Sequence, residues 1–127
     1  MNTARTLVAT ATLAAAITAL TVPAADAASD DVIKRGSCSG SATWKLKAKP
    51  RDGRIEVEGE VDSNKNGQTW RWKIKHNGTV SARGRATTKP PSGSFSVNRR
   101  MVDLSGKDVF VFRATHNGQV CRGKVSL

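Results

Sequence analysis

Residues 68–84, QTWRWKIKHNGTVSARG, have the pattern of two β-strands joined at an Asn-Gly turn. Trp70, Trp72 and Ile74 alternate with basic residues in the first strand, which is the period of two that a half-buried strand shows. The second strand alternates small apolar residues with Ser and Arg in the same way. The hairpin therefore has an apolar side and a basic side, as expected of an antiparallel sheet with one face on a core and the other in water.

The turn of this hairpin is predicted from the pairing of its strands. A two-residue loop of Asn77 and Gly78 would place Trp72 on the same face as Arg83, against the hydrophobic pattern. A three-residue loop that includes His76, with Gly78 in the left-handed position of a G1 bulge, restores the pattern. The pairs expected from this loop are Ile74 with Val80, Trp72 with Ala82 and Trp70 with Gly84.

A second hairpin is expected before the central one. Residues 42–49 alternate apolar and mostly basic side chains, residues 55–61 alternate apolar and acidic ones, and Pro50–Gly53 between them favours a turn. A four-residue loop here would place lysines opposite glutamates and a tryptophan opposite a glycine. The pairs expected are Lys47 with Glu56, Lys45 with Glu58 and Trp44 with Gly59.

Three more strands are expected at residues 94–101, 109–115 and 121–127, after a segment that its two prolines exclude from a central strand. In the last hairpin the matched faces place Phe112 over Gly123 and Ala114 beside Cys121. With residues 79–87 as the second strand of the central hairpin, the chain has seven short strands.

Seven strands, frequent turns and no helical period outside the N-terminus predict an all-β fold, a seven-stranded antiparallel sandwich of immunoglobulin/fibronectin-like topology. Strands 42–49, 55–61 and 94–101 would form one sheet, and the other four strands would form the second. An open barrel is the alternative.

The N-terminal segment has the composition of an export signal. Arg5 precedes a run rich in Ala, Leu and Thr, and Ala25-Asp26-Ala27 forms an A-x-A cleavage site. We expect residues 1–27 to be a signal peptide and the mature protein to be secreted to the extracellular space. A membrane anchor is the alternative, although the run is short for a span of about 20 residues. Residues 28–40 are then expected to be a flexible arm, and residues 41–127 the sandwich domain.

The two cysteines of the chain, Cys38 and Cys121, lie near the two ends of the expected mature protein. An exported chain meets an oxidising compartment, so we expect them to form a disulfide bond. The chain-entropy model gives a loop of this length a stabilisation of about 4 kcal/mol. A reactive thiol or a metal site is the alternative, but neither cysteine has a His or a second Cys at ligand spacing.

Turn, core and cysteine positions together resemble a group of known sequences. The positions are Cys38, Trp44, Gly67–Trp70, Asn77-Gly78, Gly93–Phe95, Asp108 and Cys121–Gly123. In this pattern the chain resembles small exported actinobacterial β-sandwich proteins of uncharacterised function. The resemblance implies the fold and export, and it transfers no active site. Cellulose-binding modules and chromoprotein apoproteins are similar in size, but inward tryptophans and a strongly basic charge fit them poorly.

The chain carries 21 Lys and Arg residues against 10 Asp and Glu residues, for a net charge of +11. Eight cations share the outward face of the sheet that contains the central hairpin. They are Arg71, Lys73, Lys75, Arg83, Arg85, Arg113, Arg122 and Lys124. No carboxylate is expected on this face, whereas the other sheet alternates lysines with glutamates.

This asymmetry predicts an exported, non-enzymatic protein that binds an anionic partner: cell-envelope polymer, acidic polysaccharide, nucleic acid or acidic protein. We expect the cations to form a diffuse field with no convergent pocket. The alternative is that they only maintain solubility and block edge pairing.

Two other binding functions remain open. Trp44, Trp70 and Trp72 could form a stacking platform for a carbohydrate, although their alternation places them in the core. A secreted inhibitor or effector could contact a protein through the Pro-containing loop Lys89–Ser92 or through the polar loop Asp62–Gly67.

An enzymatic function is not expected. The chain has two histidines and no tyrosine, and no Ser, His and acid grouping forms a recognisable nucleophile elbow. His76 and His116 follow adjacent antiparallel strands, so their turns should lie at opposite ends of the sheet, about 20 Å apart. We therefore expect no metal site, no cofactor and no small-molecule substrate.

Overall fold

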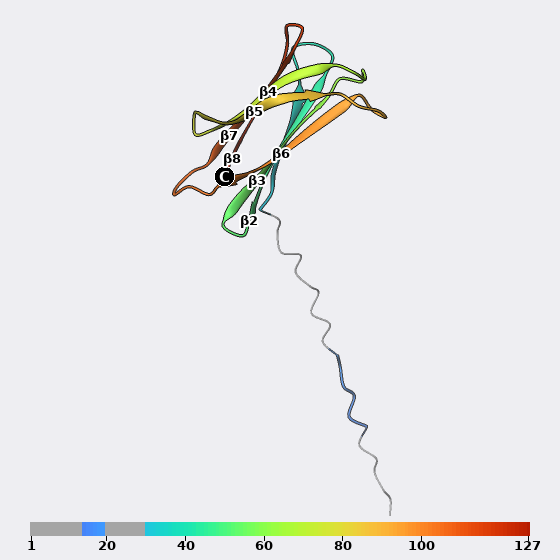
Figure 1. Cartoon of the computed structure of the whole chain (residues 1–127). Coiled ribbons are helices and arrows are strands. Elements are labelled where there is room, and N and C mark those ends of the chain that lie inside the picture. The colour runs from blue at the N-terminus through green and yellow to red at the C-terminus, as the bar shows by residue number, and fades with distance from the viewer. Residues whose placement is uncertain (1–13, 20–29) are drawn as a thin grey trace, which may run out of the picture.

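The computed structural model describes residues 14–19 and 30–127, and the expected signal peptide and its cleavage site lie largely outside these residues. Figure 1 shows strands packed in two layers. No helix in the described part of the chain is long and apolar enough to cross a membrane. The strands are β1 (Val32–Ser37), β2 (Thr43–Arg51), β3 (Arg54–Asp62), β4 (Thr69–His76), β5 (Thr79–Thr87), β6 (Ser94–Val102), β7 (Val109–His116) and β8 (Gln119–Ser126).

Each layer is a four-stranded antiparallel sheet. The first sheet has the strand order β1-β2-β3-β6, and the second has the order β5-β4-β7-β8. This is the division between two sheets that the sequence predicts, so the immunoglobulin/fibronectin-like sandwich is confirmed. The described residues form eight strands where seven were expected, because β1 was not predicted.

β1 corrects the prediction of a flexible arm at residues 28–40. All six of its residues pair with β2. The segment VIKRGS shows no clear alternation, because β1 lies at the edge of its sheet and most of its residues are exposed. Gly36 permits the pairing, since a Cβ atom there would lie only 2.6 Å from the ring of Trp44.

The β2–β3 hairpin has a tighter turn than expected. Asp52 and Gly53 alone form the loop, and both have positive φ, as in a type I′ turn. The expected register is therefore wrong by two residues. The observed pairs are Lys45 with Glu60, Lys47 with Glu58, Lys49 with Glu56 and Leu46 with Gly59. Opposite charges still face each other, because a shift of two residues leaves every side chain on its original face.

The central hairpin was also predicted with the right faces and the wrong partners. Asn77 and Gly78 form a two-residue loop with positive φ at both positions. The extra residue that restores the hydrophobic pattern is a bulge at Ser81 in β5, and not part of the turn. The observed pairs are Trp70 with Ala86, Trp72 with Gly84 and Ile74 with Ala82.

The core lies between the inward faces of the two sheets. Trp70, Phe110 and Phe112 are its largest fully buried side chains. Phe112 packs against Gly59 of the opposite sheet, where a Cβ atom would collide with the ring. In the last hairpin, the expected pairs Phe112 with Gly123 and Ala114 with Cys121 are confirmed.

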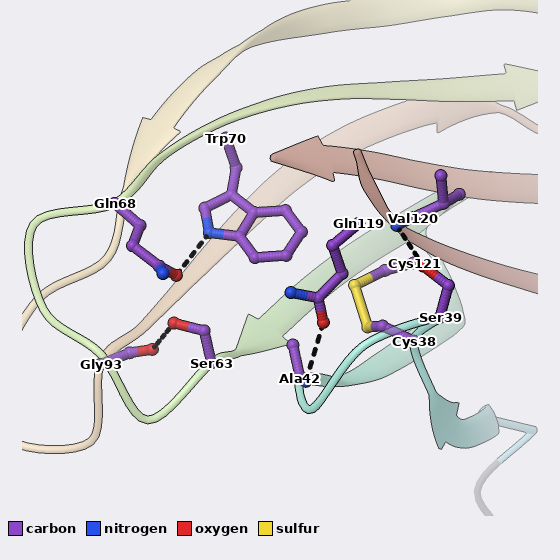
Figure 2. The surroundings of a disulfide bond; sticks show 10 residues. All are labelled: Cys38, Ser39, Ala42, Ser63, Gln68, Trp70, Gly93, Gln119, Val120 and Cys121. Carbon is purple, nitrogen blue, oxygen red and sulfur yellow. Dashed lines mark hydrogen bonds between the residues drawn. A yellow bond between two sulfur atoms is a disulfide. The ribbon is translucent and has the colours of Figure 1, made fainter. Parts of the chain in front are cut away.

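The β1–β8 side of the sandwich is closed by a disulfide bond. Cys38 and Cys121 form the bond expected from the sequence (Figure 2). Beside it, Ala42 N donates a hydrogen bond to Gln119 Oε1, and Val120 N donates one to Ser39 Oγ, both at 2.9 Å. The bond is consistent with an extracellular or other oxidising environment.

Candidate binding face

All eight cations predicted to bind an anionic partner lie on the outward side of the second sheet. Each is exposed or half-buried, whereas inward neighbours such as Trp72, Ile74 and Ala114 are buried. We call this surface the basic face. Its residues are Arg71, Lys73 and Lys75 of β4, Arg83 and Arg85 of β5, Arg113 of β7, and Arg122 and Lys124 of β8.

The strand register brings four of these cations into one row. Arg83 pairs with Lys73, Lys73 with Arg113, and Arg113 with Arg122. This cationic row crosses all four strands of the sheet, and it spans about 14 Å because neighbouring strands lie about 4.8 Å apart. A further like-charge pair lies beside the row. It consists of Arg71 and Arg85.

No acidic side chain lies on the basic face within residues 30–127; the other outward positions are Thr, Ser and Val. Every ion pair between described side chains belongs to the first sheet or joins His76 to Asp108. Like charges placed directly opposite each other destabilise a sheet. We therefore expect the like-charge pairs of the basic face to be unfavourable for the second sheet.

Two open depressions hollow the basic face, where the sequence predicts a diffuse field of cations without a convergent pocket. Each has a volume of about 440 Å³. The first depression is lined by Arg71, Lys73, Arg83, Arg85, Arg113 and Thr115, with the inward pair Trp72 and Gly84. The second depression is lined by Lys73, Lys75, Gly78, Val111, Arg113 and Arg122. Lys73 and Arg113, in the middle of the cationic row, line both.

The outward side of the first sheet arranges charge differently. Lys45 Nζ lies 3.5 Å from a carboxylate oxygen of Glu58 and 3.8 Å from one of Glu60. Lys47 Nζ lies 3.6 Å from Asp31. We call this surface the balanced face, defined by Lys45, Lys47 and Lys49 of β2 and Glu56, Glu58 and Glu60 of β3.

The tryptophans considered for carbohydrate stacking do not form an exposed platform. Trp70 is fully buried, and Trp72 is only 4% exposed. Trp44 is half-buried, with its ring covering Gly36 and Gly123. The three indole rings therefore do not form an exposed surface on which a sugar ring could stack.

The two loops considered for an inhibitor lie against each other. Ser63 Oγ donates a hydrogen bond to Gly93 O at 3.1 Å (Figure 2), and Thr88 Oγ1 donates one to Lys65 O at 2.6 Å. Gly93 has positive φ, and a side chain there would collide with the backbone of Lys65. Loops 62–67 and 89–92 thus belong to one packed unit at an end of the sandwich.

The histidines lie at opposite ends of the second sheet, as expected. His116 Nδ1 donates a hydrogen bond to Thr69 O at 2.8 Å, near the start of β4. His76 ends β4, is buried, and donates from Nε2 to Asp108 Oδ1 at 2.6 Å. No group of three or more His, Cys, Asp or Glu residues in the described part of the chain could hold a metal ion.

The buried contact between His76 and Asp108 was not predicted from the sequence. Burial raises the pKa of Asp108, but hydrogen bonds from His76 and from Leu104 N outweigh burial and leave the pKa below its ordinary value. The ionised Asp108 thereby holds loop 103–108 against the end of β4. The His76 ring also stacks on Phe110, with 4.4 Å between ring centroids.

Comparison with known proteins identifies no related protein. No protein-family model matches the chain, and no curated protein or solved structure matches it significantly. The function is therefore argued from the surfaces and buried groups described above.

Proposed function

We propose that the protein is exported and binds an anionic partner through the basic face, without catalysing a reaction. The partner classes that fit are cell-envelope polymer, acidic polysaccharide, nucleic acid and acidic protein. One observation carries the proposal. The cationic row of Arg83, Lys73, Arg113 and Arg122 crosses the whole sheet with no acid between its members.

A bound polyanion would relieve the repulsion within this row. Negative groups placed among the cations replace unfavourable neighbours with favourable ones, and the polymer releases condensed counterions as it binds. Binding should therefore be strong at low salt and weaken steeply as salt concentration rises.

Export is supported by two observations outside the basic face. The run before Ala25-Asp26-Ala27 has signal-peptide composition. The disulfide between Cys38 and Cys121 suits an oxidising compartment.

Salt-gradient elution from a heparin column tests the proposal. Replacing Arg71, Lys73 and Arg83 with Glu should abolish retention at physiological ionic strength, because it removes the centre of the basic face. Thermal stability should not fall, since two of the reversed side chains then face Arg85 and Arg113.

The matched control replaces Lys45, Lys47 and Lys49 with Glu on the balanced face. This variant has the same change in net charge and leaves the basic face intact, so it should keep most of the retention. If both triple variants elute at the same salt concentration, the basic face is not the binding site and its charge serves solubility.

A further inference from the structure

We infer that the first depression of the basic face selects phosphate or sulfate esters over carboxylates. The inference rests on the proposed function and names the ligand chemistry of the same surface. It depends on the number of cations that line the depression and on whether they are arginines or lysines.

Four of the five cations in the first depression are arginines. Arg71 comes from β4, Arg83 and Arg85 from β5, and Arg113 from β7. A guanidinium group presents five N–H donors in a planar fork and can bind two oxygens of one oxyanion. The three strands are neighbours, about 4.8 Å apart, so their arginines surround one small volume.

A phosphate or sulfate ester suits this arrangement better than a carboxylate does. A phosphate monoester carries about 1.5 to 2 negative charges at neutral pH and three terminal oxygens that point in different directions. A sulfate ester has the same three oxygens with one charge. A carboxylate has two oxygens in one plane, so it fills one guanidinium fork and leaves the neighbouring forks without an acceptor.

The arginines are not engaged by acids of the protein itself. None of the cations that line the first depression makes an ion pair with another described residue. Their outward direction is fixed by the alternation of β4, β5 and β7, whose inward side chains are packed in the core. The depression therefore gathers five cationic side chains on one side of the sheet, with no acid of the protein paired to them.

The second depression provides an internal comparison. It shares Lys73 and Arg113 with the first and adds Lys75 and Arg122, so half of its cations are lysines. A lysine ammonium acts as a point charge and has no planar fork. The second depression should add affinity for any polyanion and little preference among oxyanions.

Competition binding with three polymers of matched charge tests the inference: dextran phosphate, whose phosphates are monoesters, dextran sulfate and poly-L-glutamate. At about 0.15 M salt, the full mature protein should bind one or both of the ester polymers at least about tenfold more tightly than polyglutamate. Whichever ester polymer binds more tightly identifies phosphate or sulfate as the preferred group, and either result supports the inference.

A charge-conserving variant separates donor geometry from charge. Replacing Arg71, Arg83 and Arg85 with Lys keeps the charge and removes three planar forks, so it should reduce the preference for esters over polyglutamate to about threefold or less. The control replaces the exposed Arg35, Arg54 and Arg100 of the first sheet with Lys and should keep the preference.

Equal affinity of the wild-type protein for the three polymers would overturn the inference, as would an ester preference that survives in the Arg71, Arg83 and Arg85 variant. Both outcomes leave the proposed function standing. Binding to none of the polymers would instead overturn the proposed function.

Discussion

The outward faces of the two sheets share one architecture and differ in which charged residues lie opposite each other. Both consist of four antiparallel strands whose side chains alternate between core and solvent. On the balanced face, the register sets each lysine of β2 opposite a glutamate of β3. On the basic face, it sets Lys73 between Arg83 and Arg113.

The comparison distinguishes charged pairs that stabilise the fold from charged pairs that the fold only accommodates. The first sheet sets its three β2 lysines opposite glutamates, with like charges in register at Arg35 and Lys45 and at Arg51 and Arg54. The second sheet sets like charges in register across all four strands, which is unfavourable. A surface that lowers stability where a neighbouring sheet shows the favourable alternative is a candidate for function, because activity often conflicts with stability.

The strongest test of the comparison is the effect of charge reversal on stability. Replacing Lys45, Lys47 and Lys49 with Glu breaks ion pairs and sets each new glutamate opposite an existing one. We expect unfolding free energy to fall by about 2 kcal/mol, since three attractive pairs with β3 become repulsive and only position 45 gains an opposite charge, that of Arg35. Urea denaturation should show this loss, whereas the Arg71, Lys73 and Arg83 reversal should show none.

A loss of similar size in both variants would mean that the two faces do not differ as described. Glutamate would then be unfavourable in either sheet for reasons unrelated to register, such as β-propensity.

Lowering the pH tests the contribution of the buried Asp108 to stability separately from the basic face, which has no carboxylate to protonate. The pKa of Asp108 lies below its ordinary value, so ionised Asp108 stabilises the folded state. This contribution is complete above the unfolded pKa of about 3.9 and is lost as pH falls through that value towards the lower folded pKa. Asp108→Asn should reduce stability at neutral pH by about 1–2 kcal/mol and flatten the decline below about pH 4.

Urea titrations between pH 3 and 7 measure this change, with heparin retention at neutral pH as the control. Retention should be unaffected, because Asp108 lies at the end of the sheet and outside the basic face. A pH profile identical to that of the wild-type protein would contradict the role given to Asp108.

Salt concentration should change the folding stability contributed by the two faces differently, by less than the substitutions above. Raising the salt concentration shortens the screening length from about 10 Å at 0.1 M to about 3 Å at 1 M, which is less than the distance between strands. Screening relieves the cationic row and weakens the ion pairs of the balanced face. We expect salt to stabilise the wild-type protein by about 0.5 kcal/mol more than a Lys73→Glu variant, in which the row already alternates in sign.

The membership of the basic face could be predicted from the sequence even though the strand partners could not. Two hairpins were assigned registers that are wrong by two residues, because Asp52-Gly53 and Asn77-Gly78 form two-residue loops. A strand has a period of two, so an error of two residues preserves the face of every side chain. The alternation in Trp70–Lys75 was therefore sufficient to place its cations correctly.

The alternation of side chains along a strand cannot predict the exact strand register or contacts between residues that are distant in the sequence. The cationic row and the two depressions follow from which residues lie directly opposite, and this requires the loop lengths. β1 has no alternation to indicate a strand, and the contact of His76 with Asp108 joins the end of β4 to a loop distant in the sequence. These are tertiary features without a local pattern.

The substitution Lys73→Glu tests the central claim most directly, because Lys73 faces Arg83 on one side and Arg113 on the other. The change converts two like-charge pairs into two opposite pairs and removes the centre of the binding surface. Lys73→Gln is the intermediate control, since it removes the charge without reversing it. Lys47→Glu is the matched control on the balanced face, because Lys47 lies opposite Glu58 and near Asp31 and has no cation opposite it.

The measurement is the thermal unfolding temperature of each variant together with its elution from heparin. The account predicts that Lys73→Glu raises Tm by about 5 °C, corresponding to about 1 kcal/mol, and elutes at lower salt than the wild-type protein. Lys73→Gln should lie between them, and Lys47→Glu should lower Tm with little effect on elution. A lower Tm for Lys73→Glu, or unchanged retention, would contradict the claim that the cationic row trades stability for anion binding.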